Sequence, residues 1–155
     1  MTMFNRFTKG AGKLVSEAVD LAHELGSTSV EAEHLLLAAV RRDDAAATVL
    51  RGHGLDYDRL EAALTAETER SLAAVGVTAT APHFTRFPSK PRFATSAKVT
   101  LEGALKIAAE RQDKQISAGH VVLAALRPNR GTVPRALELA GVDRNELGAA
   151  ISSVT

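Results

Sequence analysis

The chain has 155 residues, 45% of them hydrophobic, which is enough to build one compact domain or two small ones. Its 19 lysine and arginine residues nearly balance its 18 aspartate and glutamate residues, so charge gives no reason to expect nucleic acid or a membrane surface as a partner. Cysteine is absent, which excludes disulfides and thiol catalysis. No apolar run is long enough for a signal peptide or a membrane helix, and we therefore expect a cytoplasmic protein.

The sequence contains two related copies of one unit. The segment 30–41, VEAEHLLLAAVR, returns as segment 116–127, ISAGHVVLAALR, so that His34 corresponds to His120. Self-similarity of this kind is typical of repeated structural units. We divide the chain into a first repeat at residues 1–74, a linker at residues 75–92 and a second repeat at residues 93–155.

The first two predicted elements are helices. Thr8 caps the first, whose apolar positions recur with the i, i+3, i+4, i+7 spacing of one helix face, and Gly26 ends it. The second starts near Glu31 and carries an almost continuous apolar run at residues 35–40. A helix that is apolar on nearly every side is typically central and packed by neighbours all round.

Two further helices complete the first repeat. The pair Asp43-Asp44 opens a short helix at residues 45–51, and Asp56 caps a longer one. We expect the polar face of this longer helix to be solvated surface, as charged helix faces generally are; it carries Arg59, Glu61, Glu67, Glu69 and Arg70.

The linker is unsuited to a regular helix because it contains three prolines, which lack the backbone N–H and fix φ. It also carries Phe84 and Phe87 among basic residues. The two rings either pin the linker to the body of the protein or form a separate binding segment.

The second repeat follows the same plan, and no stretch shows the sustained alternation of a strand. We expect its helices at residues 95–111, from Ser117 to Pro128, from Thr132 to Gly141 and, capped by Asp143, at residues 144–152. The predicted architecture is all-α, with eight helices in two pseudo-symmetric groups of four that pack as one compact domain.

Residues with catalytic or metal-binding potential are dispersed. The five histidines lack the close spacing of a zinc site, and no nucleophile-elbow motif surrounds a serine. His34 and His120 occupy equivalent places in the first turn of the central helices, where hydrogen bonding to the backbone is the favoured role. We therefore predict a protein that is not an enzyme and has no metal site and no cofactor.

Three features together resemble a known family. They are the opening MFNRFT at residues 3–8, the block EHLLLA at residues 33–38, and the duplicated four-helix unit. The chain is similar in these respects to the Clp N-terminal domain of the ClpA, ClpB and ClpC unfoldases, and above all to that of ClpC. The resemblance covers essentially the whole chain and implies a domain that binds substrates, adaptor proteins and regulatory ligands.

The resemblance also implies a site for phosphorylated arginine. In ClpC-type domains the glutamate of the E-H pair holds the guanidinium group, and the threonine after the first phenylalanine helps to hold the phosphate. These positions are Glu33 and Thr8 in the first repeat but Gly119 and Ala94 in the second. We expect at most one such pocket, in the first repeat, although Glu33 also suits the helix terminus by itself.

A second site implied by the resemblance is a surface where cyclic peptide antibiotics dock on ClpC. The matching residues here are Phe4, Gly12, Ser16, Phe93 and Lys98. Exposed aromatic side chains that cluster make plausible anchors for a ligand. The alternative for Phe7 and Phe93 is that they fill equivalent gaps between helices.

The leading hypothesis is a free-standing, non-catalytic module without the ATPase part, which binds protein or peptide ligands, including Clp-targeting cyclic peptides. We expect it to modulate or protect ClpC-dependent proteolysis, with the ClpC/ClpP machinery or adaptor proteins as partners. The alternative is the excised N-terminal substrate-recognition domain of a full-length ClpC-type unfoldase. An enzyme with a site between the repeats is the third hypothesis, and the sequence offers no convergent titratable groups for it.

Overall fold

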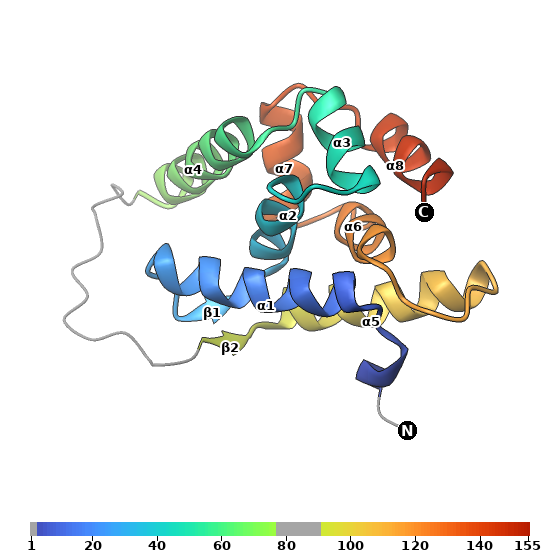
Figure 1. The fold of residues 1–155 in the computed structure, drawn as a ribbon. Helices are drawn as coiled ribbons and strands as arrows, with labels where there is room; N and C mark the ends of the chain where they lie inside the picture. Colours follow the sequence, from blue (N-terminus) through green and yellow to red (C-terminus); the bar gives the residue numbers. More distant parts are fainter. Residues whose placement is uncertain (1–2, 77–90) are drawn as a thin grey trace.

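The computed structural model describes residues 3–76 and 91–155, and the predicted linker lies largely outside this range. In the described residues the fold is all-α, as predicted, with eight α-helices (Figure 1). The elements in chain order are η1 (Met3–Arg6), α1 (Lys9–Glu24), β1 (Ser29–Val30), α2 (Ala32–Val40), α3 (Ala45–Gly52), α4 (Tyr57–Ala74), β2 (Arg92–Phe93), α5 (Thr95–Glu110), α6 (Ala118–Leu126), α7 (Thr132–Leu139) and α8 (Arg144–Ser153).

The helix boundaries follow the capping residues that the sequence predicted. The Thr8 side chain accepts a hydrogen bond from the Ala11 N–H at 3.1 Å, which satisfies one of the unpaired donors at the start of α1. The carboxylates of Asp44, Asp56 and Asp143 do the same at the starts of α3, α4 and α8. Each cap fixes where its helix begins, and these predictions are confirmed.

The core is built around α2 and α6, the two helices with continuous apolar runs. Every residue of α2 from His34 to Val40 is buried, and α6 is buried at all positions from Gly119 to Leu126 except Leu123. Figure 1 shows α1 and α5 below this central pair and the remaining helices above it. The predicted central role of both helices is confirmed, because neither presents a polar face to solvent.

The two repeats are joined by short parallel pairings of extended backbone. β1 pairs with β2, with Ser29 opposite Arg92 and Val30 opposite Phe93. An isolated bridge joins Phe7 to Ile116 in the equivalent place of the other repeat. Each pairing therefore links the segment before the central helix of one repeat to the segment before the first helix of the other.

One sequence prediction about α4 is wrong. Glu67 was expected on a solvated face, but the side chain is 4% exposed and forms an ion pair with Arg135 of α7 at 2.6 Å. Burial raises the pKa of Glu67, but hydrogen bonds from Ser71 and Arg135 outweigh it and hold the pKa below its usual value. The repeat packing buries this position, because α4 lies against α7 of the other repeat.

Candidate functional site

The start of α1 and the start of α6 meet at one junction between the repeats. The Thr8 N–H donates to the Ile116 carbonyl at 2.9 Å, and the Ile116 N–H donates to the Arg6 carbonyl at 2.8 Å. Phe7, between them, is half-buried against the core. Thr8 therefore faces the second repeat's central helix, whose first turn contains Gly119.

The start of α5 and the start of α2 meet at the equivalent second junction. The Ala94 N–H donates to the Val30 carbonyl at 2.9 Å, and the Ala32 N–H donates to the Ser96 hydroxyl at 2.9 Å. Here Ala94, without a hydroxyl group, stands next to the helix that carries Glu33.

The structure thus does not bring Thr8 and Glu33 to the same junction. Thr8 caps the start of α1, whereas β1 and the start of α2 lie at the far end of α1 (Figure 1). The 16 residues of α1 separate these ends by roughly 24 Å at 1.5 Å per residue. The cause is the exchange between repeats: each central helix starts beside the first helix of the other copy. Sequence alignment of the repeats does not reveal this exchange.

The equivalent histidines His34 and His120 both close the first turn of their helices. The Glu31 N–H donates to His34 Nδ1 at 2.8 Å, and the Ser117 N–H donates to His120 Nδ1 at 2.9 Å. Because a backbone N–H can only donate, each Nδ1 is the unprotonated nitrogen of a neutral ring. Burial lowers the pKa of His34 and so favours this neutral form, against the opposing charge of Glu31. The predicted backbone role of both histidines is confirmed.

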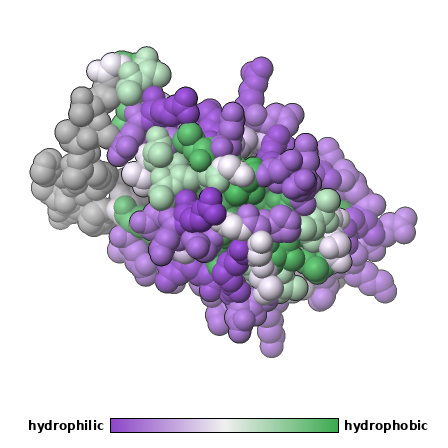
Figure 2. Space-filling model, turned by 90° about the horizontal axis from the view of Figure 1, so that it is seen from above, coloured by the Kyte–Doolittle hydropathy of each residue, from purple (hydrophilic) through white to green (hydrophobic). Residues whose placement is uncertain are grey.

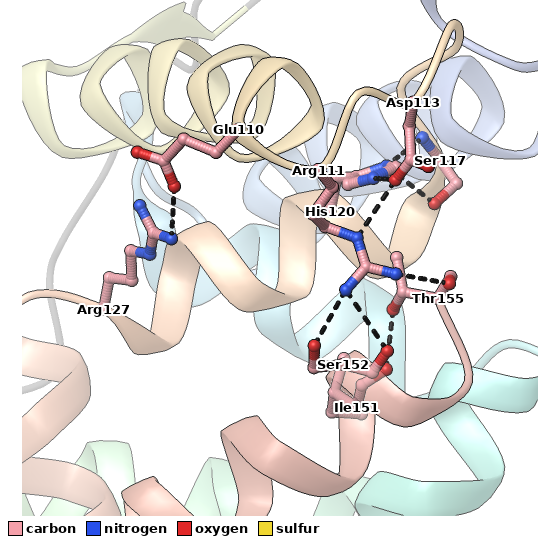
Figure 3. A network of polar contacts seen from close by, with 9 residues as sticks. All are labelled: Glu110, Arg111, Asp113, Ser117, His120, Arg127, Ile151, Ser152 and Thr155. Atoms are coloured by element: carbon pink, nitrogen blue, oxygen red, sulfur yellow. Dashed lines mark hydrogen bonds and ion pairs between the residues drawn. The ribbon is translucent and has the colours of Figure 1, made fainter.

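His120 also lies between Ser117 and Asp113 in a row of hydrogen bonds (Figure 3). His120 Nε2 contacts the Asp113 carboxylate at 2.7 Å, and this bond, with one from Arg111, holds the pKa of Asp113 below its usual value. The Ser117 backbone N–H shares the Nδ1 lone pair with the hydroxyl, and the ring is 3% exposed. This geometry secures a helix start and does not prepare a serine nucleophile.

The junction at α6 is closed by residues near the end of the chain. A Cβ atom on Gly119 would lie 2.4 Å from the Thr155 Oγ1 atom, so this helix position tolerates no side chain while Thr155 is seated there. Arg111 fixes Thr155 in this position by donating hydrogen bonds to the Thr155 carbonyl at 2.7 Å and to the Ser152 hydroxyl at 2.8 Å (Figure 3). The counterpart of Glu33 is therefore absent, and its place is filled.

Among residues 3–76 and 91–155, none closes the junction at α2, which forms part of a groove of about 1020 Å³ between the repeats. Its walls come from the starts of α2 and α5, from α4, and from the segment between α6 and α7. Two large apolar side chains at its edge, Leu25 and Val99, are 46% and 51% exposed. Seen from above, the described surface is mostly hydrophilic with apolar patches across its middle (Figure 2). Exposed apolar side chains beside a groove are typical of a binding surface.

Among the carboxylates that line this groove, Glu33 has a strongly raised pKa. Burial, together with the nearby charge of Glu31, raises the pKa of Glu33 to about 7 against a usual value of 4.5. The Glu31 carboxylate itself accepts hydrogen bonds from the hydroxyls of Ser29 and Ser96. Within the described part of the chain, no side-chain donor or cation neutralises Glu33 in this way. Half-neutral carboxyl groups in a cleft are candidates for a functional role.

The residues predicted for a cyclic peptide site are distributed over both repeats. Gly12 and Ser16 are exposed one turn apart on α1, and Lys98 is exposed on α5. Phe93 is half-buried against the core beside Val30, as expected of a residue that fills a gap between helices. The side chain of Phe4 lies outside the described part of the structure.

Among the residues that the structure describes, no group of three or more His, Cys, Asp or Glu side chains is arranged to hold a metal ion. No helix in residues 3–76 and 91–155 is long and apolar enough to cross a membrane.

Comparison with known proteins identifies this two-repeat architecture. The family model of the Clp repeat (R) N-terminal domain matches residues 6–87 and again residues 92–155. The chain belongs to this family. The double match agrees with the internal duplication and with the two equivalent helix junctions.

Several curated proteins contain a related Clp repeat region. The chain is 28% identical over 145 residues to "Negative regulator of genetic competence ClpC/MecB" of Bacillus subtilis, and 28% identical over 146 residues to "Chaperone protein ClpB" of Oceanobacillus iheyensis. Each alignment covers 93% of this chain but 16% of the relative. The chain therefore spans about a sixth of the length of these relatives and matches their Clp repeat region.

Solved structures show the same fold. The N-terminal domain of the chaperone ClpD from Arabidopsis thaliana has a TM-score of 0.73 at 22% identity, covering 98% of this chain and 96% of that one. A complex of the ClpV N-domain with a VipB peptide has a TM-score of 0.60 at 18% identity, covering 97% of this chain and 89% of that one. The Clp repeat fold is thus shared at low sequence identity.

Sequence reasoning proposed Glu33 as a site residue but did not predict the groove around it. Leu25 and Val99 fit the apolar periodicity of their helices and so carried no signal of exposure. The sequence did carry a signal that the other junction is filled. Gly119 replaces a glutamate there, and glycine is required where another group approaches the backbone closely.

Proposed function

We propose that this chain is a non-catalytic binding module that captures segments of other proteins in the groove between its Clp repeats. In this way it modulates or protects ClpC-dependent proteolysis. The main observation in support of this proposal is the difference between the two junctions. One is filled by Thr155, and the other opens into a groove with exposed Leu25 and Val99. Apolar surface of this kind at the edge of a groove favours peptide capture over a purely structural role.

The comparisons support a protein or peptide partner. One structural neighbour, the ClpV N-domain, is described in complex with a peptide from VipB. The curated relatives are named as chaperones and as a regulator of competence. For this chain we propose the same general class of partner, with Clp substrates, adaptor proteins or Clp-targeting cyclic peptides as the specific ligands.

A second candidate function is that of the substrate-recognition domain of a full-length ClpC-type unfoldase. It is favoured by the share of the relatives that the chain covers, which is 16% for both ClpC/MecB and ClpB. Reading the gene beyond the codon for Thr155 separates the two candidates. A Walker A motif in the same frame supports the unfoldase domain, and a stop codon supports the separate module.

Thermal unfolding of the 155-residue chain with added ligands tests the binding function. The probes are a Clp-targeting cyclic peptide, free phosphoarginine and an unstructured substrate peptide. A ligand present at about 100 times its dissociation constant adds about 2.7 kcal/mol, which raises Tm by roughly 5–10 °C for a chain of this length.

Two variants that each add an arginine locate the site. Val99→Arg places the new side chain in the groove, whereas Ser16→Arg places it on the exposed face of α1 where the cyclic peptide site is proposed. Loss of the Tm shift in Val99→Arg alone assigns the ligand to the groove, and loss in Ser16→Arg alone assigns it to α1. Unchanged Tm with every probe contradicts the proposed function.

A further inference from the structure

The charges around the groove are strongly one-sided. Its described lining includes the carboxylates of Glu31, Glu33, Glu61 and Glu69 but a single guanidinium group, that of Arg130. Between these charged groups the walls are largely apolar, with Leu25, Leu37, Leu64, Val99 and Val133 among them. A ligand that complements this surface carries positive charge between apolar groups.

The side-chain hydroxyl that would help to hold a phosphate is missing beside Glu33. The N-cap of α5 is Ala94, which has no side-chain hydroxyl and makes no side-chain capping bond. The nearby hydroxyl of Ser96 is already engaged, since it accepts from the Ala32 N–H and donates to the Glu31 carboxylate. A phosphate at this junction would instead meet like charge from Glu31.

Of the two carboxylates at the start of α2, Glu33 is the one available to a ligand. A serine hydroxyl donates to each oxygen of Glu31, whereas Glu33 is half-buried near other carboxylates and has no side-chain partner among the described residues. A guanidinium or ammonium group that reaches Glu33 would gain a charge-assisted hydrogen bond and remove the repulsion from Glu31. The geometry of the junction thus favours an incoming cation.

Building on the proposed function, we infer that the groove binds a peptide segment that carries an unmodified arginine or lysine between apolar residues, and that it discriminates against phosphorylated arginine. The cationic side chain contacts Glu33 at the start of α2, and the flanking apolar side chains contact Leu25 and Val99. The ligand class follows from four carboxylates against one guanidinium and from the alanine at the α5 N-cap.

Three fluorescein-labelled nonapeptides that differ at one position test the inference by fluorescence anisotropy. Each has the sequence Gly-Ser-Val-Leu-X-Leu-Val-Ser-Gly, where X is arginine, phosphoarginine or citrulline, which is similar in shape to arginine but neutral. The arginine peptide is expected to bind at least about 10-fold more tightly than each of the other two, as one charge-assisted contact commonly provides.

Variants of the full chain assign the preference to Glu33. Glu33→Gln is expected to reduce the advantage of arginine over citrulline to less than about 3-fold, whereas Glu102→Gln, an exposed site on α5 outside the groove, leaves it unchanged. Circular dichroism confirms that both variants fold.

The outcomes separate this inference from the proposed function. If phosphoarginine binds as tightly as arginine or more tightly, or if citrulline equals arginine, the inference is overturned while peptide binding stands. If none of the three peptides binds, both the inference and the peptide-binding function of the groove are overturned.

Discussion

Replacing Glu33 by glutamine removes a negative charge that the folded chain disfavours. Because burial and the charge of Glu31 raise the pKa of Glu33 from 4.5 to about 7, the folded chain retains a proton on this group where the unfolded chain has lost it. Stability therefore falls as the pH rises through this interval. Above pH 7 the penalty approaches about 3 kcal/mol, at 1.36 kcal/mol for each pKa unit, and below the unfolded pKa it vanishes.

Urea unfolding followed by circular dichroism from pH 4 to pH 8.5 measures this effect. Relative to the parent chain, Glu33→Gln is expected to gain little or nothing at pH 4 and up to about 3 kcal/mol at pH 8.5. The matched variant Glu102→Gln, at an exposed site, is expected to follow the parent at every pH. Parallel profiles for Glu33→Gln and the parent would refute the reasoning, because the carboxyl group would then titrate equally in both states.

Three further substitutions test individual contacts that stabilise the fold. Arg135→Ala leaves the buried Glu67 carboxylate without its ion pair and is expected to cost about 1–3 kcal/mol in urea unfolding at pH 7. Because the folded-state pKa of Glu67 is lowered, this cost diminishes as the pH falls towards 3, and a cost that does not change with pH would contradict the assignment. Gly119→Ala is expected to lower Tm by displacing Thr155. In a Thr155→Gly background the same change is expected to raise stability by about 0.5–1 kcal/mol, because alanine has the higher helix propensity. Equal effects in both backgrounds would show that the two residues do not touch. His34→Ala removes the acceptor at the start of α2 and is expected to cost about 1 kcal/mol at pH 7.5. Since burial lowers the pKa of His34, the parent loses stability as the pH drops below 6.5, so the cost shrinks at pH 5.5, and a cost that grows there would contradict the neutral-ring geometry.

The sequence predicted the helices well because their signals are local. Capping by Thr8 or Asp56 depends on residues three positions away, and the apolar run at 35–40 defines a central helix whatever surrounds it. The internal duplication predicted two equivalent halves, and the equivalent histidines predicted a shared backbone role. These predictions are confirmed because they do not depend on long-range contacts.

The candidate site depends on long-range contacts and was predicted only in part. The sequence pointed to Thr8 and Glu33 as one pocket, but the exchange between repeats sets them at opposite ends of α1. Likewise, the burial of Glu67 requires α7 of the other repeat to pack on α4, which no periodicity within α4 reveals. The sequence also could not predict what fills the junction at α6, because this depends on where Thr155 lies.

The most direct test of the account is an NMR titration of the uniformly ¹⁵N-labelled chain with the arginine nonapeptide. The account predicts that the backbone amides that shift most lie around the groove, including those of Ala32, Val99 and Gly131, and that Gly148 on α8 is unaffected. Shifts centred on α8 or on the exposed face of α1, or no shifts at millimolar peptide, would contradict the claim that the open junction between the Clp repeats is the binding site.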